Sequence, residues 1–171
     1  MTDAGTLKVS ALGDREIVMR RAFNAPRSLV FDAWTKPDLL KRWLLGPPGW
    51  SMAVCEIDLR VGGAYRFVWR RDNDGHEMGM GGVYQEVVRP ERLVATEKFD
   101  QAWYPGEALV STVLIEQGGK TVMTSTMLYE SREARDGVLK SPMESGVAAS
   151  YDRLAELLAS TSWPGASQAG A

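Results

Sequence analysis

The segment that decides the fold lies in the middle of the chain. Residues 56–69 read EIDLRVGGAYRFVW, residues 81–87 read GGVYQEV and residues 90–94 read PERLV. Glycine and proline break this segment into successive strands, because both residues favour turns over strand interiors. Tyr65, Phe67 and Trp69 follow one another at a period of two, which places three large aromatic rings on one face. That face covers an interior that is either filled or open to a ligand.

Strands are expected on both sides of this segment. The alternation of apolar and polar residues predicts strands at residues 16–23, 51–59, 64–71, 80–88, 92–99, 108–117 and 120–129. Asp72-Asn73-Asp74-Gly75 and Gly118-Gly119 are suitable hairpin turns, since Gly and Asn tolerate the positive φ angles that tight turns need. Most of the chain is therefore expected to form one antiparallel sheet.

Helical spacing occurs near both ends of the chain. Pro26 suits a first helical turn, and a second short helix must end before Gly46-Pro47-Pro48-Gly49, which cannot continue it. Ser141 and Glu144 have the spacing of a capping box, ahead of a helix that runs to about Ala159. At 1.5 Å per residue this helix is roughly 27 Å long, enough to cross a whole sheet.

Length and composition favour one soluble domain. The chain has 171 residues, with 20 Lys and Arg against 22 Asp and Glu, so neither nucleic acid nor an anionic membrane is an expected partner. The single cysteine excludes an intramolecular disulfide, and no signal peptide or membrane span is recognised, which predicts a cytoplasmic protein. We expect an N-terminal extension at residues 1–14, a domain at 15–159 and a loose tail at 160–171.

The order of these elements predicts an α+β fold. A curved antiparallel sheet of about seven strands would wrap around the long C-terminal helix, with two short helices after the first strand. The chain also carries a series of ordered motifs: Ala25-Pro26, Trp34-Thr35, Trp43 with Gly46-Pro47, Asp58-x-Arg60-x-Gly62-Gly63, Gly82-x-Tyr84-x-Glu86-Val87, Pro90-Glu91-Arg92-Leu93-Val94, and Gly146 before Asp152-Arg153-Leu154.

These motifs resemble the START-like (SRPBCC) superfamily, and within it the homologues of the activator of heat-shock-protein-90 ATPase. The resemblance covers residues 15–159. It implies a helix-grip fold with a cavity between the sheet and the long helix. It also implies kinship with ligand carriers, polyketide cyclases and co-chaperone domains.

The candidate site is the set of aromatic and methionine side chains on the inner face. A curved sheet around one helix tends to leave space, and methionine adapts to varied apolar ligands, although an ordinary filled core is the alternative. The expected ligand-binding residues are Trp34, Trp43, Tyr65, Phe67, Trp69, Tyr84, Met123, Met127, Met143 and Tyr151, with Glu97 and Ser125 orienting polar atoms of the ligand.

Glu97 and Asp58 are the two carboxylates that need a partner. If Phe99 points inward, the period of two takes Glu97 inward with it, at a cost of several kcal/mol unless the carboxylate is paired. We favour a structural pair with Arg21 over a carboxyl of raised pKa that acts as an acid or base. Asp58, with Arg60 beside Gly62-Gly63, is expected to fix a strand crossing, and Arg21 is also its candidate partner.

The remaining reactive residues favour binding over catalysis. His76 is the only histidine and lies in a polar turn, and Cys55 alternates within a strand as a packed thiol. We therefore expect no catalytic residue, metal site or cofactor. The expected partner is a hydrophobic small molecule. The alternatives are a co-chaperone-type module that contacts a chaperone, self-association, and a cyclase-like enzyme that uses Glu97 or an inward tyrosine.

Overall fold

The computed structural model describes residues 6–101 and 106–160. In these ranges the strands are β1 (Lys8–Leu12), β2 (Glu16–Phe23), β3 (Trp50–Ile57), β4 (Ala64–Arg71), β5 (Glu77–Val88), β6 (Arg92–Phe99), β7 (Ala108–Gln117) and β8 (Lys120–Leu128). The helices are α1 (Arg27–Thr35), α2 (Pro37–Leu40), α3 (Arg132–Lys140) and α4 (Met143–Ala159). Of the predicted loose tail, residues 161–171 lie outside the described residues.

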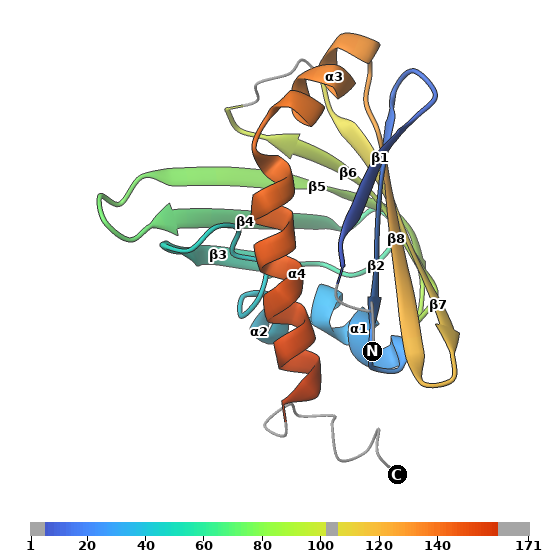
Figure 1. Ribbon diagram of the computed structural model, residues 1–171. Helices are drawn as coiled ribbons and strands as arrows, with labels where there is room; N and C mark the ends of the chain where they lie inside the picture. Colours follow the sequence, from blue (N-terminus) through green and yellow to red (C-terminus); the bar gives the residue numbers. More distant parts are fainter. Residues whose placement is uncertain (1–5, 102–105, 161–171) are drawn as a thin grey trace.

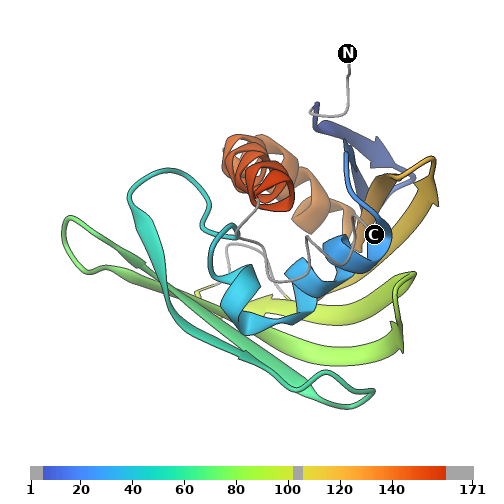
Figure 2. The same ribbon diagram turned by 90° about the horizontal axis from the view of Figure 1, so that it is seen from below.

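The strands form one antiparallel sheet that curves around α4. Their order is β1-β2-β8-β7-β6-β5-β4-β3, so only the connection from β2 to β3, which contains α1 and α2, leaves the hairpin pattern. Figure 1 shows α4 lying diagonally across the concave face, and Figure 2, from below, shows α1 and α2 at one end between the sheet and α4. The predicted α+β helix-grip architecture is confirmed.

The described strands number eight, one more than expected. β1 lies in the stretch that was assigned to an N-terminal extension, and it pairs with β2 from Lys8↔Arg20 to Leu12↔Glu16. It is an edge strand whose side chains are mostly exposed, with Leu12 at 51%. Leu7, Val9 and Ala11 alternate with Lys8 and Ser10, so the sequence contained a strand pattern that the expected N-terminal extension did not take into account.

The predicted capping box at Ser141 is wrong. Its hydroxyl donates to the carbonyl of Val138 (2.6 Å) and so closes the end of α3. α4 follows Pro142, and no side chain caps its first turn. The hydroxyl that caps a helix here is that of Ser131, which accepts from the amide of Ala134 (3.0 Å) at the start of α3.

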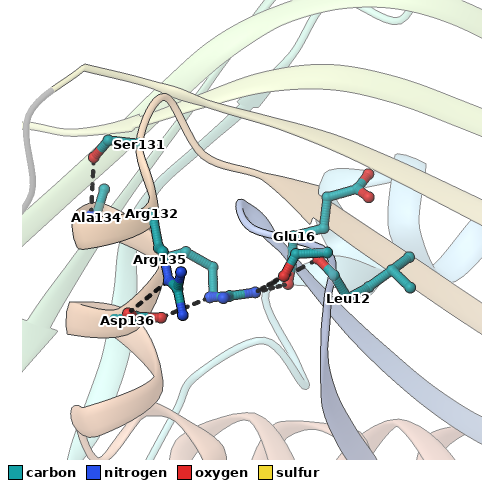
Figure 3. A network of polar contacts seen from close by, with 8 residues as sticks. Leu12, Glu16, Ser131, Arg132, Ala134, Arg135 and Asp136 are labelled. Atoms are coloured by element: carbon teal, nitrogen blue, oxygen red, sulfur yellow. Dashed lines mark hydrogen bonds and ion pairs between the residues drawn. The ribbon is translucent and has the colours of Figure 1, made fainter.

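Arg135 attaches α3 to the hairpin between β1 and β2. Its side chain is buried, and Nη1 donates to the carbonyls of Gly13 (3.2 Å) and Glu16 (2.9 Å), with a longer contact to Leu12 (Figure 3). Nε donates to the carboxylate of the adjacent Asp136 (2.8 Å). Because charge-assisted bonds to carbonyls satisfy a buried guanidinium, this contact holds the first hairpin against the C-terminal helices.

The Asp58–Gly63 motif forms the turn between β3 and β4. Arg60 Nε lies 3.0 Å from the carboxylate of Asp58, within the turn itself. The turn is also tied to β5, since the amide of Gly62 donates to Tyr84 O (2.8 Å) and the amide of Tyr84 donates to Gly63 O (2.9 Å). The predicted pair of Asp58 with Arg21 is therefore wrong, and the motif fixes the turn through its own residues.

Candidate functional site

Two apolar clusters fill the interior. The first includes Phe23, Trp43, Phe67, Met123 and Leu154, and it occupies the end of the sheet covered by α1 and α2. The second includes Ile17, Met19, Met127, Tyr129 and Val138, beneath α3. Phe99 of β6 and Val147 of α4 pack against both clusters.

A row of polar side chains crosses the sheet between these clusters. On β2, Arg21 lies between Met19 of the second cluster and Phe23 of the first. On β8, Ser125 likewise separates Met123 from Met127. Because alternate residues of a strand share a face, both polar side chains point into the concave side with their apolar neighbours.

Two further polar side chains lie on the inner face of the next two strands. Thr112 of β7 pairs with Ser125, and their hydroxyl oxygens lie 3.2 Å apart. Glu97 of β6 shares its face with Phe99, and it pairs with Ala108, a fully buried member of the second cluster. Because Thr112 pairs with Leu93, Glu97 is offset along the strands from the pair of hydroxyl groups. We call the side chains of Arg21, Ser125, Thr112 and Glu97 the polar belt.

Arg21 is the cation of the belt. It is 5% exposed, its Nη1 lies 2.7 Å from Asp152 Oδ1 on α4, and its guanidinium stacks 5.1 Å from the ring centre of Phe23. Its Nε is buried and has no hydrogen-bond partner among the described residues. The pair with Asp152 replaces both partners that were predicted for Arg21, so the expected structural pair with Glu97 is wrong.

Glu97 is left without a partner in the described part of the chain. Its side chain faces the interior and is half-buried, and no described donor bonds its carboxyl. Removal of water around the carboxylate raises the pKa of Glu97 to about 7, with no opposing charge or hydrogen bond. This carboxyl thus changes its charge near neutral pH.

Tyr151 faces the belt from α4. It is 3% exposed and shares a hydrogen bond with the side chain of Ser125. The pKa of Tyr151 is raised to about 12, mainly by burial. The charge of Glu97 also raises it, while the bond to Ser125 and the charge of Arg21 lower it. The phenol therefore stays neutral at physiological pH, and its coupling to Glu97 places the two groups near each other.

Tryptophans around Tyr151 belong to the packed core. Trp34 and Trp43 meet edge to face with ring centres 4.7 Å apart, and Tyr151 lies 6.5 Å and 6.2 Å from them. The indole of Trp43 donates to Ala33 O (3.0 Å), and that of Trp34 donates to Met123 Sδ (3.0 Å). Satisfied indoles in edge-to-face contact fix the position of Tyr151 opposite the belt.

Tyr65 reaches across β5 because Gly82 has no side chain. A Cβ at Gly82 would collide with the Thr96 carbonyl and would lie 2.9 Å from the Tyr65 ring. With that space free, the hydroxyl of Tyr65 donates to the Thr96 carbonyl (2.7 Å), one residue before Glu97. The ring also contacts Phe67, with centres 5.0 Å apart.

The predicted wall residues divide by exposure. Those buried in the core are Trp43, Tyr65, Phe67, Tyr84, Met123, Ser125, Met127 and Tyr151. Those that remain half-buried are Trp34, Trp69, Glu97 and Met143. Phe99 and Val147, which were not in the predicted set, are half-buried as well. Solvent therefore reaches the inner face beside Glu97, where β6 and α4 approach both clusters.

A depression lies on the opposite, convex face. It is a shallow depression of about 240 Å³ lined by residues that include Thr96, Leu109 and Leu128. Thr96 alternates with Glu97 on β6, so the depression and the polar belt are on opposite sides of the sheet. None of the predicted wall residues lines it.

Sequence reasoning missed Thr112 and Asp152. The inward direction of Thr112 could have been predicted, because Thr112 alternates with Leu114 on a strand whose inner face is mainly apolar. Asp152 has no such signal, since it is exposed and only the rotation of α4 over β2 brings it to Arg21.

Metal ligands do not gather in residues 6–101 and 106–160: no three His, Cys, Asp or Glu side chains there are placed to hold an ion. Within the same ranges no helix has the length and apolar character needed to span a bilayer.

A curved antiparallel sheet closed by one long C-terminal helix, with a polar belt across its inner face, defines a helix-grip protein. Residues 24–159 match the family described as Activator of Hsp90 ATPase homolog 1-like protein. The chain belongs to this family, in agreement with the resemblance of its motifs.

Solved structures of several bacterial proteins share the fold. A protein from Rhodobacter sphaeroides is 31% identical with a TM-score of 0.84, and the match covers 90% of this chain and 97% of that one. A protein from Chromobacterium violaceum is 28% identical with a TM-score of 0.71, covering 84% and 96%. An AHSA1-like protein from Aeromonas hydrophila, at 18% identity and a TM-score of 0.66, covers 81% and 91% and shows the fold alone. No curated protein matches the chain.

Proposed function

We propose that this protein binds an apolar or aromatic small molecule between the concave face of the sheet and α4, without covalent chemistry. The observation that supports the proposal is Glu97. Buried carboxyl groups are normally paired, because desolvation without compensation costs several kcal/mol. The Glu97 carboxyl points inward, has no described partner and lies next to accessible apolar surface. These are the properties of a group that binds a ligand.

The surroundings of Glu97 supply the apolar contacts. Phe99 and Val147 keep part of their surface accessible on the inner face, although each packs against both clusters. Tyr151 of α4 and Ser125 of β8 present hydroxyl groups that are bonded to each other. A ligand with a planar or branched apolar body and one polar group would satisfy both sets of side chains.

Binding is tested by isothermal titration with 2-naphthylmethanol as the probe. Val147→Trp adds an indole to the inner face of α4, and we expect it to weaken binding by about tenfold or more. Leu109→Trp adds the same bulk to the convex depression, and we expect it to leave the affinity unchanged. Circular dichroism verifies that both variants fold.

Two results would contradict the proposal. Absence of saturable binding to the wild type would remove it. Loss of binding in Leu109→Trp with binding kept in Val147→Trp would move the site to the convex face.

A further inference from the structure

We propose that the interior site selects cationic ligands, and that Glu97 pairs with an ammonium group carried on an aromatic or aliphatic body. This inference rests on the proposed function and names the class of ligand that the same site takes.

The distribution of charged side chains in the interior favours a cationic ligand. Among the described residues the buried cations are Arg21 and Arg135. Arg21 is neutralised by Asp152, and Arg135 is bonded to backbone carbonyls and to Asp136. Neither guanidinium is bonded to Glu97, so the negative charge of ionised Glu97 is not balanced by a bonded cation among the described residues. A cationic ligand removes that imbalance, whereas an anionic ligand would increase it.

Aromatic rings near Glu97 favour the same class. Phe99 lies two residues away on the same face of β6. Tyr151 of α4 is close enough for the charge of Glu97 to raise the pKa of its phenol. On the side of β4 and β5, the hydroxyl of Tyr65 is bonded to the carbonyl of Thr96. Ring faces attract a desolvated cation and gain nothing comparable from a neutral or anionic group.

The pH dependence follows from the groups that face Glu97. These are Tyr151 of α4, Tyr65 of β4, whose hydroxyl is bonded beside it to Thr96, and Tyr84 of β5, which pairs with Ala95. Arg21 of β2 is the nearest buried cation along the sheet, three strands away. The guanidinium keeps its charge, and burial holds the pKa values of Tyr84 and Tyr151 far above neutrality. Glu97, with a pKa of about 7, is then the group whose charge changes between mildly acidic and mildly basic conditions. Preference for a cation should accordingly be strong above neutrality and weak below it.

The experiment compares three probes that share one ring system. Isothermal titrations use 2-naphthylmethylammonium, 2-naphthylmethanol and 2-naphthoate with the wild type, Glu97→Gln and the control Glu156→Gln, an exposed position on α4. At about pH 8 we expect the wild type to bind the ammonium roughly tenfold more tightly than the alcohol, and the naphthoate least tightly. Glu97→Gln should remove this preference and keep the alcohol affinity within about twofold, while Glu156→Gln should keep the preference. At about pH 5.5 the wild type should behave like Glu97→Gln.

The possible failures are distinguishable. If the alcohol or the naphthoate binds as tightly as the ammonium, or if Glu97→Gln keeps the preference, the cationic class is wrong and the proposed binding function stands. If no probe binds to the wild type, both proposals fail.

Discussion

Replacing Glu97 by glutamine should stabilise the free protein above neutral pH. The unfolded carboxyl has an ordinary pKa of 4.5, whereas the folded protein holds its proton up to about 7. Between these values the folded state binds more protons, so its free energy of unfolding falls as the pH rises and the full penalty applies above about pH 7. Each unit of pKa difference corresponds to 1.36 kcal/mol, so the difference between the folded and unfolded pKa values sets an upper limit on the order of 3 kcal/mol for this penalty. Because the side chain is only half-buried and water partly screens its charge, we expect a gain of about 2 kcal/mol in the variant.

Urea denaturation followed by tryptophan fluorescence measures this effect. At about pH 8, Glu97→Gln should be more stable than the wild type, and at about pH 4, where both states of the wild type are protonated, the difference should nearly vanish. Glu156→Gln controls for the loss of a negative charge at an exposed position and should show no such dependence. A stability difference between Glu97→Gln and the wild type that is the same at both pH values would refute the assignment of an unpaired, ionisable interior carboxyl.

Two further predictions concern the scaffold of the site and are checked by the same denaturation. Gly82→Ala should lower the free energy of unfolding by about 2 kcal/mol or more, because the added Cβ meets the Thr96 carbonyl. Gly137→Ala in the middle of α3 should be neutral or stabilising, because nothing lies within 4 Å of the new Cβ. Similar losses at both positions would contradict the close approach at Gly82. Asp152→Asn should lower the free energy of unfolding by about 2 kcal/mol, because it leaves the charge of Arg21 buried and unpaired. The double variant with Arg21→Met should recover part of that loss. Equal losses in the single and double variants would show that the pair contributes nothing.

Local periodicity was enough to predict most of the fold. β4, β6 and β7 begin and end at the predicted residues, because each has an apolar inner face that fixes its register. α4 also occupies the predicted range. The capping box at Ser141 failed because the hydroxyl had a competing acceptor, the carbonyl of Val138, at the end of a helix that was not predicted.

The site was only partly readable from the sequence. The inward direction of Glu97 follows from strand alternation alone. Its lack of a partner does not, since Arg21 pairs with a residue 131 positions away, on a helix whose rotation over β2 the sequence does not specify. The same limit applies to the wall: alternation places Tyr65 and Phe67 inward, but packing decides that they are buried while Phe99 stays accessible. A cytoplasmic location stays a prediction, and a chaperone partner, self-association and a cyclase-like activity stay the alternatives to ligand binding.

The most direct test of the interior site is a map of amide chemical-shift changes in isotope-labelled protein titrated with 2-naphthylmethanol. Binding between the sheet and α4 predicts that the largest changes occur at Glu97, Val147 and Tyr151. Largest changes at Leu109 and Leu128, on the convex face, would contradict it.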